Sequence, residues 1–331
     1  MERLIFHVDV NSAFLSWEAT RRVSLGEEDI RLIPSAIGGD REKRTGVILA
    51  KSIPAKKFGI RTGEPVATAL RKCPDLYLAR PDFRLYEASS KAFIEICKQY
   101  APVVEQVSID ECFLDMSGTH RIYPDPIAIA TTIKDKIRDE LGFTVNVGIG
   151  DCKLLAKMAS DFEKPDKVHT LFRHEIARKM WPMRVGELFS VGHSTAEKLE
   201  KAKINTIGDL ANTEVTRVQR IVGMKMGKQI YDYANGIDPS PVLAAPEEAN
   251  LSEEMISLSC RFGRYMIPNP YLKPAEAVSG PRCRQASSGS HTGSKDCSLS
   301  DPVCPPPPSH PARAISWHRV WYRHSSGSHR A

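Results

Sequence analysis

Residues 107–118 read VSIDECFLDMSG, and two adjacent acids, Asp110 and Glu111, interrupt a stretch that is otherwise typical of a buried strand. A carboxylate that is buried without a compensating partner is strongly destabilising. The flanking segments, VVEQVSI over 103–109 and CFLDMS over 112–117, predict the two strands of a hairpin with both acids at its tip. The surrounding fold must therefore explain why two acids stand there.

Outward from this hairpin, the sequence predicts an α+β fold. Alternating or continuous apolar residues indicate strands, and apolar residues at three- and four-residue spacing indicate helices. We expect strands over 3–9, 31–37, 45–50, 143–150 and 167–172, and helices over 12–23, 65–72, 83–100, 126–141 and 153–162. This order is typical of a ferredoxin-like split βαβ sheet, with a long insertion after its first strand that forms a separate lobe.

Residues 185–240 change in character, because short helical segments alternate there with Gly and Asn turns. The stretch SVGHSTAEKLEKAKINTIGDLA predicts a helix–hairpin–helix, with a hairpin around Gly192 and a helix that begins near Ser194. Backbone N–H groups at the start of a helix suit a phosphate. An ordinary helical hairpin turn accounts for this segment alone equally well.

After about residue 250 the sequence follows neither a helical nor a strand period, and it is rich in Ser, Pro, Arg, His and Cys. Such a composition offers no buried face, so we expect disorder. Cys297, Cys304 and His310 do not have the spacing of a usual zinc site. The abrupt change of composition motivates the hypothesis that this segment is translated out of frame, which the gene sequence beyond codon 250 would test.

The composition of the 331-residue chain is that of a soluble, cytoplasmic protein. No apolar run approaches the roughly 18 residues that span a bilayer, and the eight cysteines form no CxxC pair. The net charge of +6 does not indicate nucleic-acid binding by the folded part, because the basic excess lies after residue 260.

A third acid, Asp9, ends the first expected strand, which lies beside the hairpin in a split βαβ sheet. Three carboxylates at one place repel each other unless a divalent cation lies among them. Mg²⁺ prefers such oxygen ligands, and a pair of ions can clamp the two oxygens of a phosphoryl displacement. The alternative is that Asp110 and Glu111 are solvated turn residues and that Asp9 caps the next helix.

Four segments carry a family resemblance: HVDVNSAFLSWE, AKSIPAKKFGIRTG, VSIDECFLDMSG and GIGDCKLLAKMASDFEKPD. In this order and spacing they resemble a Y-family DNA polymerase of the bacterial polymerase IV type, from residue 3 to about 240. The resemblance implies a palm (1–12 and 82–172), fingers (13–81) and a helix–hairpin–helix thumb (173–242). A fourth domain, the little finger, should follow at about 245, but nothing in 243–331 resembles one.

The resemblance also implies a set of site residues. Asp9, Asp110 and Glu111 match the catalytic acids that hold two Mg²⁺ with the carbonyl of Val10, and Phe14 matches the steric gate that excludes ribonucleotides. The expected nucleotide-binding residues are Asn11, Ser12, Ala13, Phe14, Ser52, Lys56 and Lys164. The expected DNA-binding residues are Val191, Gly192 and Ser194. The chain departs from many relatives at Ile53, Lys56 and Ser190, which replace a Tyr, an Arg and a Gly.

A protein of this family adds deoxynucleotides to a primer end without proofreading, so primer–template DNA and deoxynucleoside triphosphates are the expected partners of a monomeric enzyme. The clamp-binding peptide through which intact relatives reach the sliding clamp is not recognisable here. Without a little finger we expect weak binding to primer–template. Two other interpretations remain: an impaired polymerase that acts at most as a DNA-binding protein, and a nucleotide cyclase with a similar palm.

Overall fold

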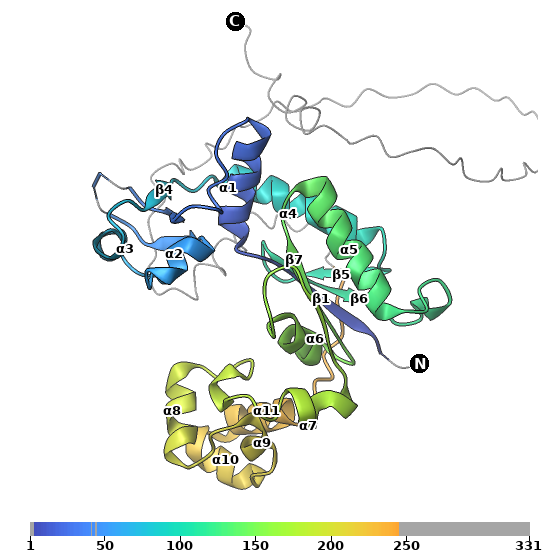
Figure 1. Ribbon diagram of the computed structural model, residues 1–331. Coiled ribbons are helices and arrows are strands. Elements are labelled where there is room, and N and C mark those ends of the chain that lie inside the picture. The colour runs from blue at the N-terminus through green and yellow to red at the C-terminus, as the bar shows by residue number, and fades with distance from the viewer. Residues whose placement is uncertain (1–2, 41, 44, 245–331) are drawn as a thin grey trace, which may run out of the picture. The chain divides into compact units, whose positions relative to one another are not determined.

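The computed structural model describes residues 3–40, 42–43 and 45–244, and Figure 1 shows their arrangement. The expectations for residues 245–331, including disorder and the loss of a little finger, lie outside the described residues.

The segments predicted to form the palm build a five-stranded sheet. Its strand order is β5 (Val103–Gln106), β6 (Glu111–Asp115), β1 (Ile5–Val10), β7 (Val145–Gly150) and β8 (Val168–Leu171). The central strand β1 runs antiparallel to both β6 and β7, whereas β7 and β8 are parallel. The expectation that the first strand lies beside the hairpin is therefore confirmed.

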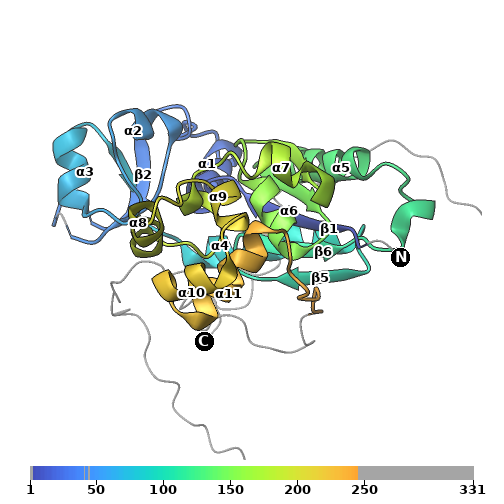
Figure 2. The same ribbon diagram turned by 90° about the horizontal axis from the view of Figure 1, so that it is seen from below.

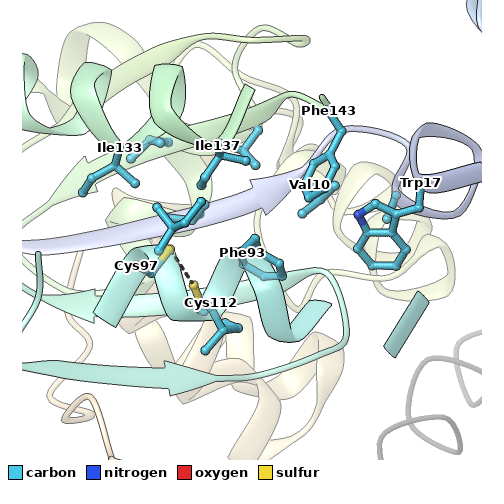
Figure 3. Packing of buried hydrophobic residues seen from close by; sticks show 14 of the residues in the cluster. Val10, Trp17, Phe93, Cys97, Cys112, Ile133, Ile137 and Phe143 are labelled. Carbon is cyan, nitrogen blue, oxygen red and sulfur yellow. Dashed lines mark hydrogen bonds between the residues drawn. The ribbon is translucent and has the colours of Figure 1, made fainter. Parts of the chain in front are cut away.

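Helices cover the two faces of this sheet. In Figure 1, α4 (Phe83–Lys98) and α5 (Pro126–Leu141) lie on one side and α6 (Lys153–Ser160) on the other. Figure 3 shows the core beneath α4 and α5, where Phe93, Ile133 and Ile137 pack with Val10. On the other face, Ile5 packs with Ala156 of α6. Successive residues of β1 therefore alternate between a wholly apolar core and the α6 side.

The described cysteines are buried free thiols. They are Cys73, Cys97, Cys112 and Cys152. Cys97 and Cys112 meet in the palm core with their sulfurs 4.0 Å apart (Figure 3).

The inserted lobe has its own three-stranded sheet, with the order β3 (Ile48–Lys51), β2 (Ser35–Gly38) and β4 (Tyr77–Ala79). Helices α2 (Ile53–Lys57) and α3 (Val66–Lys72) lie beside it, as Figure 2 shows. Its core contains Ile48, Ile60 and Val66. Helix α1 (Ala13–Ser24) buries its apolar residues in the palm core instead. The sequence did not predict α2 or β4, since elements of five and three residues show no clear period.

Short helices form the predicted thumb around a second apolar core, which also includes residues of α6. They are α7 (Ile176–Lys179), α8 (His193–Lys201), α9 (Ile207–Ala211), α10 (Val215–Val222) and α11 (Met224–Ala234). Three 3-10 turns complete the described chain: η1 (Thr119–Arg121), η2 (Arg173–Glu175) and η3 (Val185–Glu187). Among the described helices, none has the length and apolar character that a membrane crossing requires.

Candidate active site

Strand pairing brings the three predicted acids to one end of the central strands. Asp9 on β1 pairs directly with Glu111 on β6, and opposed residues of an antiparallel pair share a face. Asp110 directly precedes Glu111, and its carbonyl accepts a hydrogen bond of 3.0 Å from the Val10 N–H. Because Glu111 is the first residue of β6, the expectation that it lies at the hairpin tip was wrong; the connection is formed by residues 107–110.

The structure disagrees with the alternative explanation, in which these acids are a helix cap and solvated turn residues. Helix α1 begins after Ser12, so Asp9 does not cap it. Asp110 and Glu111 are half-buried rather than solvated turn residues. All three acids therefore incur a burial cost that another group must offset.

Lys164 compensates Asp9. Its ammonium forms an ion pair with Asp9 Oδ2 and a second one of 2.8 Å with Asp161 Oδ1. Burial raises the pKa of Asp9, and the positive charge of Lys164 opposes that rise. Burial lowers the pKa of Lys164, but the charges and hydrogen bonds of Asp9 and Asp161 together outweigh this effect, so the net pKa is raised. Lys164 is therefore a charged partner of Asp9 in the free protein.

Glu111 is compensated from β1 and α6. Its Oε2 accepts from Lys157 Nζ at 2.5 Å and from His7 Nε2 at 3.3 Å. Burial alone would raise the pKa of Glu111, but the His7 hydrogen bond and the Lys157 charge outweigh it and lower the pKa to about 2. Glu111 is therefore ionised at neutral pH. Burial lowers the pKa of His7, whose side chain is only 1% exposed.

Asp110 has no cationic partner among the described residues. Its Oδ1 accepts a hydrogen bond of 2.6 Å from the Ser108 hydroxyl. Burial raises the pKa of Asp110, the Ser108 hydrogen bond lowers it, and the negative charge of Glu111 raises it further. Asp110 is therefore the acid of this site that most needs a positive charge beside it.

The donor set suits a hard divalent cation, although the described residues form no preassembled group of three His, Cys, Asp or Glu ligands. Carboxylate oxygens are the ligands that Mg²⁺ prefers. The raised pKa values of Asp9 and Asp110 show that both carboxylates lack sufficient positive charge. A cation bound here would favour their ionised forms and would compete with Lys164 for Asp9.

The first turn of α1 follows directly after the acids. The side chain of Asn11 is used inside the protein, since its Nδ2 donates to Asn146 Oδ1 at 3.2 Å and its Oδ1 accepts from the Asp166 N–H at 3.0 Å. Ser12 has a left-handed backbone, with φ of 49°, and its side chain does not cap the helix. The N–H groups at the beginning of α1, from Ala13 onward, are therefore left without a side-chain cap.

Phe14 lies half-buried at the start of α1. Its ring stacks on Tyr86 of α4, with centroids 4.6 Å apart and planes inclined by 17°. Sequence reasoning missed Tyr86, because nothing in its local pattern distinguishes it from other core residues of α4. The stacking fixes the ring that, by the family resemblance, is expected to be the steric gate.

The two predicted residues of the fingers differ in exposure. Ser52 is 2% exposed, and its hydroxyl accepts from the N–H groups of Ala55 and Ser35 and donates to the Ile33 carbonyl. These contacts begin α2 and join it to β2. Lys56 lies exposed on α2 and is free to meet an anion.

In the thumb, the predicted DNA-binding residues lie at the start of α8. Val191 is 7% exposed, Gly192 is the N-cap residue, and Ser194 is exposed in the first turn. Ser190 has a φ of 73°, a left-handed conformation that favours glycine. This geometry explains why a Gly would be expected at that position.

Comparisons with known proteins agree with this fold. Residues 8–161 match the impB/mucB/samB family, and residues 186–238 match the thumb domain of DNA polymerase iota. The chain is 47% identical over 260 residues to DNA polymerase IV of Clostridium acetobutylicum, covering 78% of this chain and 65% of that protein. The chain belongs to the Y-family of DNA polymerases.

Other Y-family members are similar to this chain as well. DNA polymerase IV of Clostridium kluyveri is 40% identical over 242 residues, covering 73% of this chain and 59% of the relative. A solved Y-family DNA polymerase chimera of Dbh and Dpo4 superposes with a TM-score of 0.66 at 22% identity, over 74% of this chain and 70% of the other. That likeness concerns the fold. The chain spans less than two thirds of the length of these curated relatives.

Proposed function

We propose that this protein is a template-directed DNA polymerase of the translesion type, which adds deoxynucleotides to a primer 3′ end. The observation that carries the proposal is the convergence of Asp9, Asp110 and Glu111 at one end of β1 and β6, in a chain that belongs to the Y-family. The proposed substrates are deoxynucleoside triphosphates and primer–template DNA, and the enzyme acts as a monomer without proofreading.

In this proposal, the carboxylates of Asp9, Asp110 and Glu111 and the carbonyl of Val10 hold two Mg²⁺. The ions supply charge neutralisation at the primer hydroxyl and at the triphosphate. Lys164 binds the triphosphate as a point charge, and the uncapped N–H groups of α1 face its phosphates.

The remaining steps are positioning and exclusion. The ring of Phe14, which stacks on Tyr86, would face the sugar of the incoming nucleotide, so that a ribose 2′-hydroxyl would collide with it. The N–H groups at the start of α8 hold a DNA phosphate. Catalysis then consists of orientation and charge stabilisation rather than of a covalent intermediate.

Primer extension by the purified full-length chain tests the proposal. We expect Mg²⁺-dependent extension of a labelled primer by the wild type, and a loss of at least about 100-fold in Asp110→Asn, since one electrostatic group at a transition state contributes that much. The matched control is Asp139→Asn, the same change at an exposed position of α5. A folded wild type that extends no primer with Mg²⁺ or Mn²⁺, or an Asp110→Asn variant with unchanged activity, refutes the proposal.

A further inference from the structure

His7 is a buried imidazole that the proposed mechanism has not used. It lies in the middle of β1, two residues before Asp9, and its side chain faces α6 together with Asp9 and Glu111. Apolar residues occupy most other positions of this strand. A polar side chain at such a position must have both ring nitrogens hydrogen-bonded to avoid a desolvation cost.

Both nitrogens of the His7 ring have a partner. Nδ1 lies 2.8 Å from the Ser160 hydroxyl at the end of α6, and Nε2 lies 3.3 Å from Oε2 of Glu111. Phe113 packs against the ring, with centroids 4.6 Å apart. Residues from β6 and α6 therefore fix the plane of the imidazole, and the ring links Ser160 to an acid of the active site.

The direction of the His7–Glu111 hydrogen bond follows from the chemistry of its partners. An ionised carboxylate only accepts hydrogen bonds, so Nε2 must carry the proton, whichever charge the ring has. When the ring is neutral, Nδ1 is an acceptor and the Ser160 hydroxyl donates to it. When the ring is charged, Nδ1 donates and the hydroxyl turns to the Lys157 carbonyl, 2.8 Å away. Ser160 satisfies Nδ1 in both states.

The two carboxylate oxygens of Glu111 differ in the hydrogen bonds that they accept. His7 and Lys157 both donate to Oε2, and within the described residues no group donates a hydrogen bond to Oε1. We propose that His7 is a positioning residue. Ser160 fixes the His7 ring, and the Nε2–H of this ring holds Oε2 of Glu111, so that Oε1 of Glu111 faces the divalent cation. This rests on the proposed function, in which Glu111 holds metal.

The neighbouring Lys157 cannot replace His7 in this role. An ammonium on a flexible stem provides charge with little directional constraint. Lys157 is also engaged elsewhere, since its Nζ lies 5.4 Å from the ring centre of Phe189 in the thumb. A planar ring held on both sides fixes direction, as the second layer of a metal site does.

Two substitutions at His7 distinguish the loss of the hydrogen bond to Glu111 from the loss of side-chain packing at this position. In His7→Gln the amide NH₂ reaches the place of Nε2 and can still donate to Glu111. In His7→Asn the shorter amide reaches only the place of Nδ1, so it keeps the Ser160 contact and loses Glu111. Ser160→Ala leaves the ring in place and removes its orienting partner. His120→Asn, at an exposed histidine of η1, is the control.

The readouts are the Mn²⁺ dissociation constant of the free protein, measured by electron paramagnetic resonance, and the half-saturating Mg²⁺ concentration in primer extension. We expect both to rise about tenfold in His7→Asn, since loss of a second-layer partner costs that much. His7→Gln should restore most of the affinity, and Ser160→Ala should show a smaller rise. Circular dichroism and melting curves monitor the fold of every variant.

Unchanged metal dependence in a folded His7→Asn overturns the positioning role. If His7→Asn does not fold, unchanged metal dependence in Ser160→Ala overturns it. The proposed function fails separately: a wild type that binds Mn²⁺ but extends no primer refutes the polymerase while leaving the His7 effect on binding in place. A wild type that neither binds Mn²⁺ nor extends a primer refutes both.

Discussion

The palm acids and the thumb hairpin are assembled in opposite ways. Asp9 and Glu111 owe their proximity to strand pairing between distant parts of the chain, and their partners His7, Lys157 and Lys164 come from β1, α6 and the loop that follows α6. The thumb hairpin, in contrast, is one turn formed by residues 190–194. The palm site is half-buried and internally compensated, whereas Gly192 and Ser194 of the hairpin are exposed to solvent.

This difference between the palm site and the thumb hairpin predicts where substitutions should change function most. In the palm, each charge offsets the burial of another, so removing one group alters its partners as well. In the thumb, the groups proposed to hold a phosphate are backbone N–H groups, which a side-chain substitution does not remove. We therefore expect large functional effects in the palm and small, local effects in the thumb.

Apart from the acids themselves, the largest expected effect is on nucleotide use in Lys164→Ala. A charge-assisted hydrogen bond contributes about 1.5–3 kcal/mol, so kcat/KM for the incoming nucleotide should fall by about 10–100-fold. Steady-state single-nucleotide incorporation measures this. Lys167→Ala removes an exposed lysine of the same loop and should leave kcat/KM unchanged. Equal kinetics for the two variants would remove Lys164 from the site.

The next effect is on sugar discrimination in Phe14→Ala. Removing the ring opens space for a 2′-hydroxyl, so the ratio of kcat/KM for deoxy- and ribonucleotides should fall by about 10–100-fold. Phe83→Ala is the control, because Phe83 also contacts Tyr86, edge-on with ring centroids 5.9 Å apart, and is 42% exposed. If both variants keep the wild-type ratio, Phe14 does not contact the sugar.

A third effect concerns the stability of the metal-free protein. Burial raises the pKa of Asp110 and the charge of Glu111 raises it further, whereas the Ser108 hydrogen bond and the charge of Lys157 oppose this rise without cancelling it. The folded state therefore binds this proton more tightly than the unfolded chain, and the free energy of unfolding falls as pH rises from about 3.9 through the folded-state pKa.

Asp110→Asn removes this penalty, so in EDTA at pH 7 the variant should be more stable by about 1 kcal/mol, the usual scale of a single substitution. Its advantage should vanish below pH 4. Urea unfolding at pH 7 and pH 3.5 measures both values. A less stable variant at pH 7 would show that Asp110 is already compensated in the free protein.

Much of the scaffold could be predicted from local signals. The helix expected over 126–141 is confirmed at both ends, because Asp125 caps it through the N–H groups of Ile127 and Ala128 and Gly142 ends it with a φ of 74°. Helix α4 is likewise confirmed, ending two residues earlier than predicted. Such start and stop signals lie next to the helix in the sequence, so a single sequence is enough to predict where these helices begin and end.

The candidate site could be predicted only in part. The three acids stand out because carboxylates interrupt apolar strands, but the partners of His7 and Lys157 depend on how α6 packs across the sheet. Tyr86 is read from the sequence as an ordinary core residue, and its stacking on Phe14 requires α1 and α4 to meet. Contacts between distant segments leave no local period, so the roles assigned to these residues remain predictions.

The smallest expected effect is in the thumb, in Ser190→Gly. Ser190 has a φ of 73°, which costs a non-glycine residue about 1–2 kcal/mol. Glycine removes that strain but gains freedom in the unfolded chain, so the net rise in stability should be about 0.5 kcal/mol. Differential scanning calorimetry measures the rise, and fluorescence anisotropy with labelled primer–template should show equal or tighter binding. Ser194→Gly, inside the first turn of α8, should lower stability instead. A loss of stability in both variants would mean that the Ser190 side chain contributes more than its backbone strain costs.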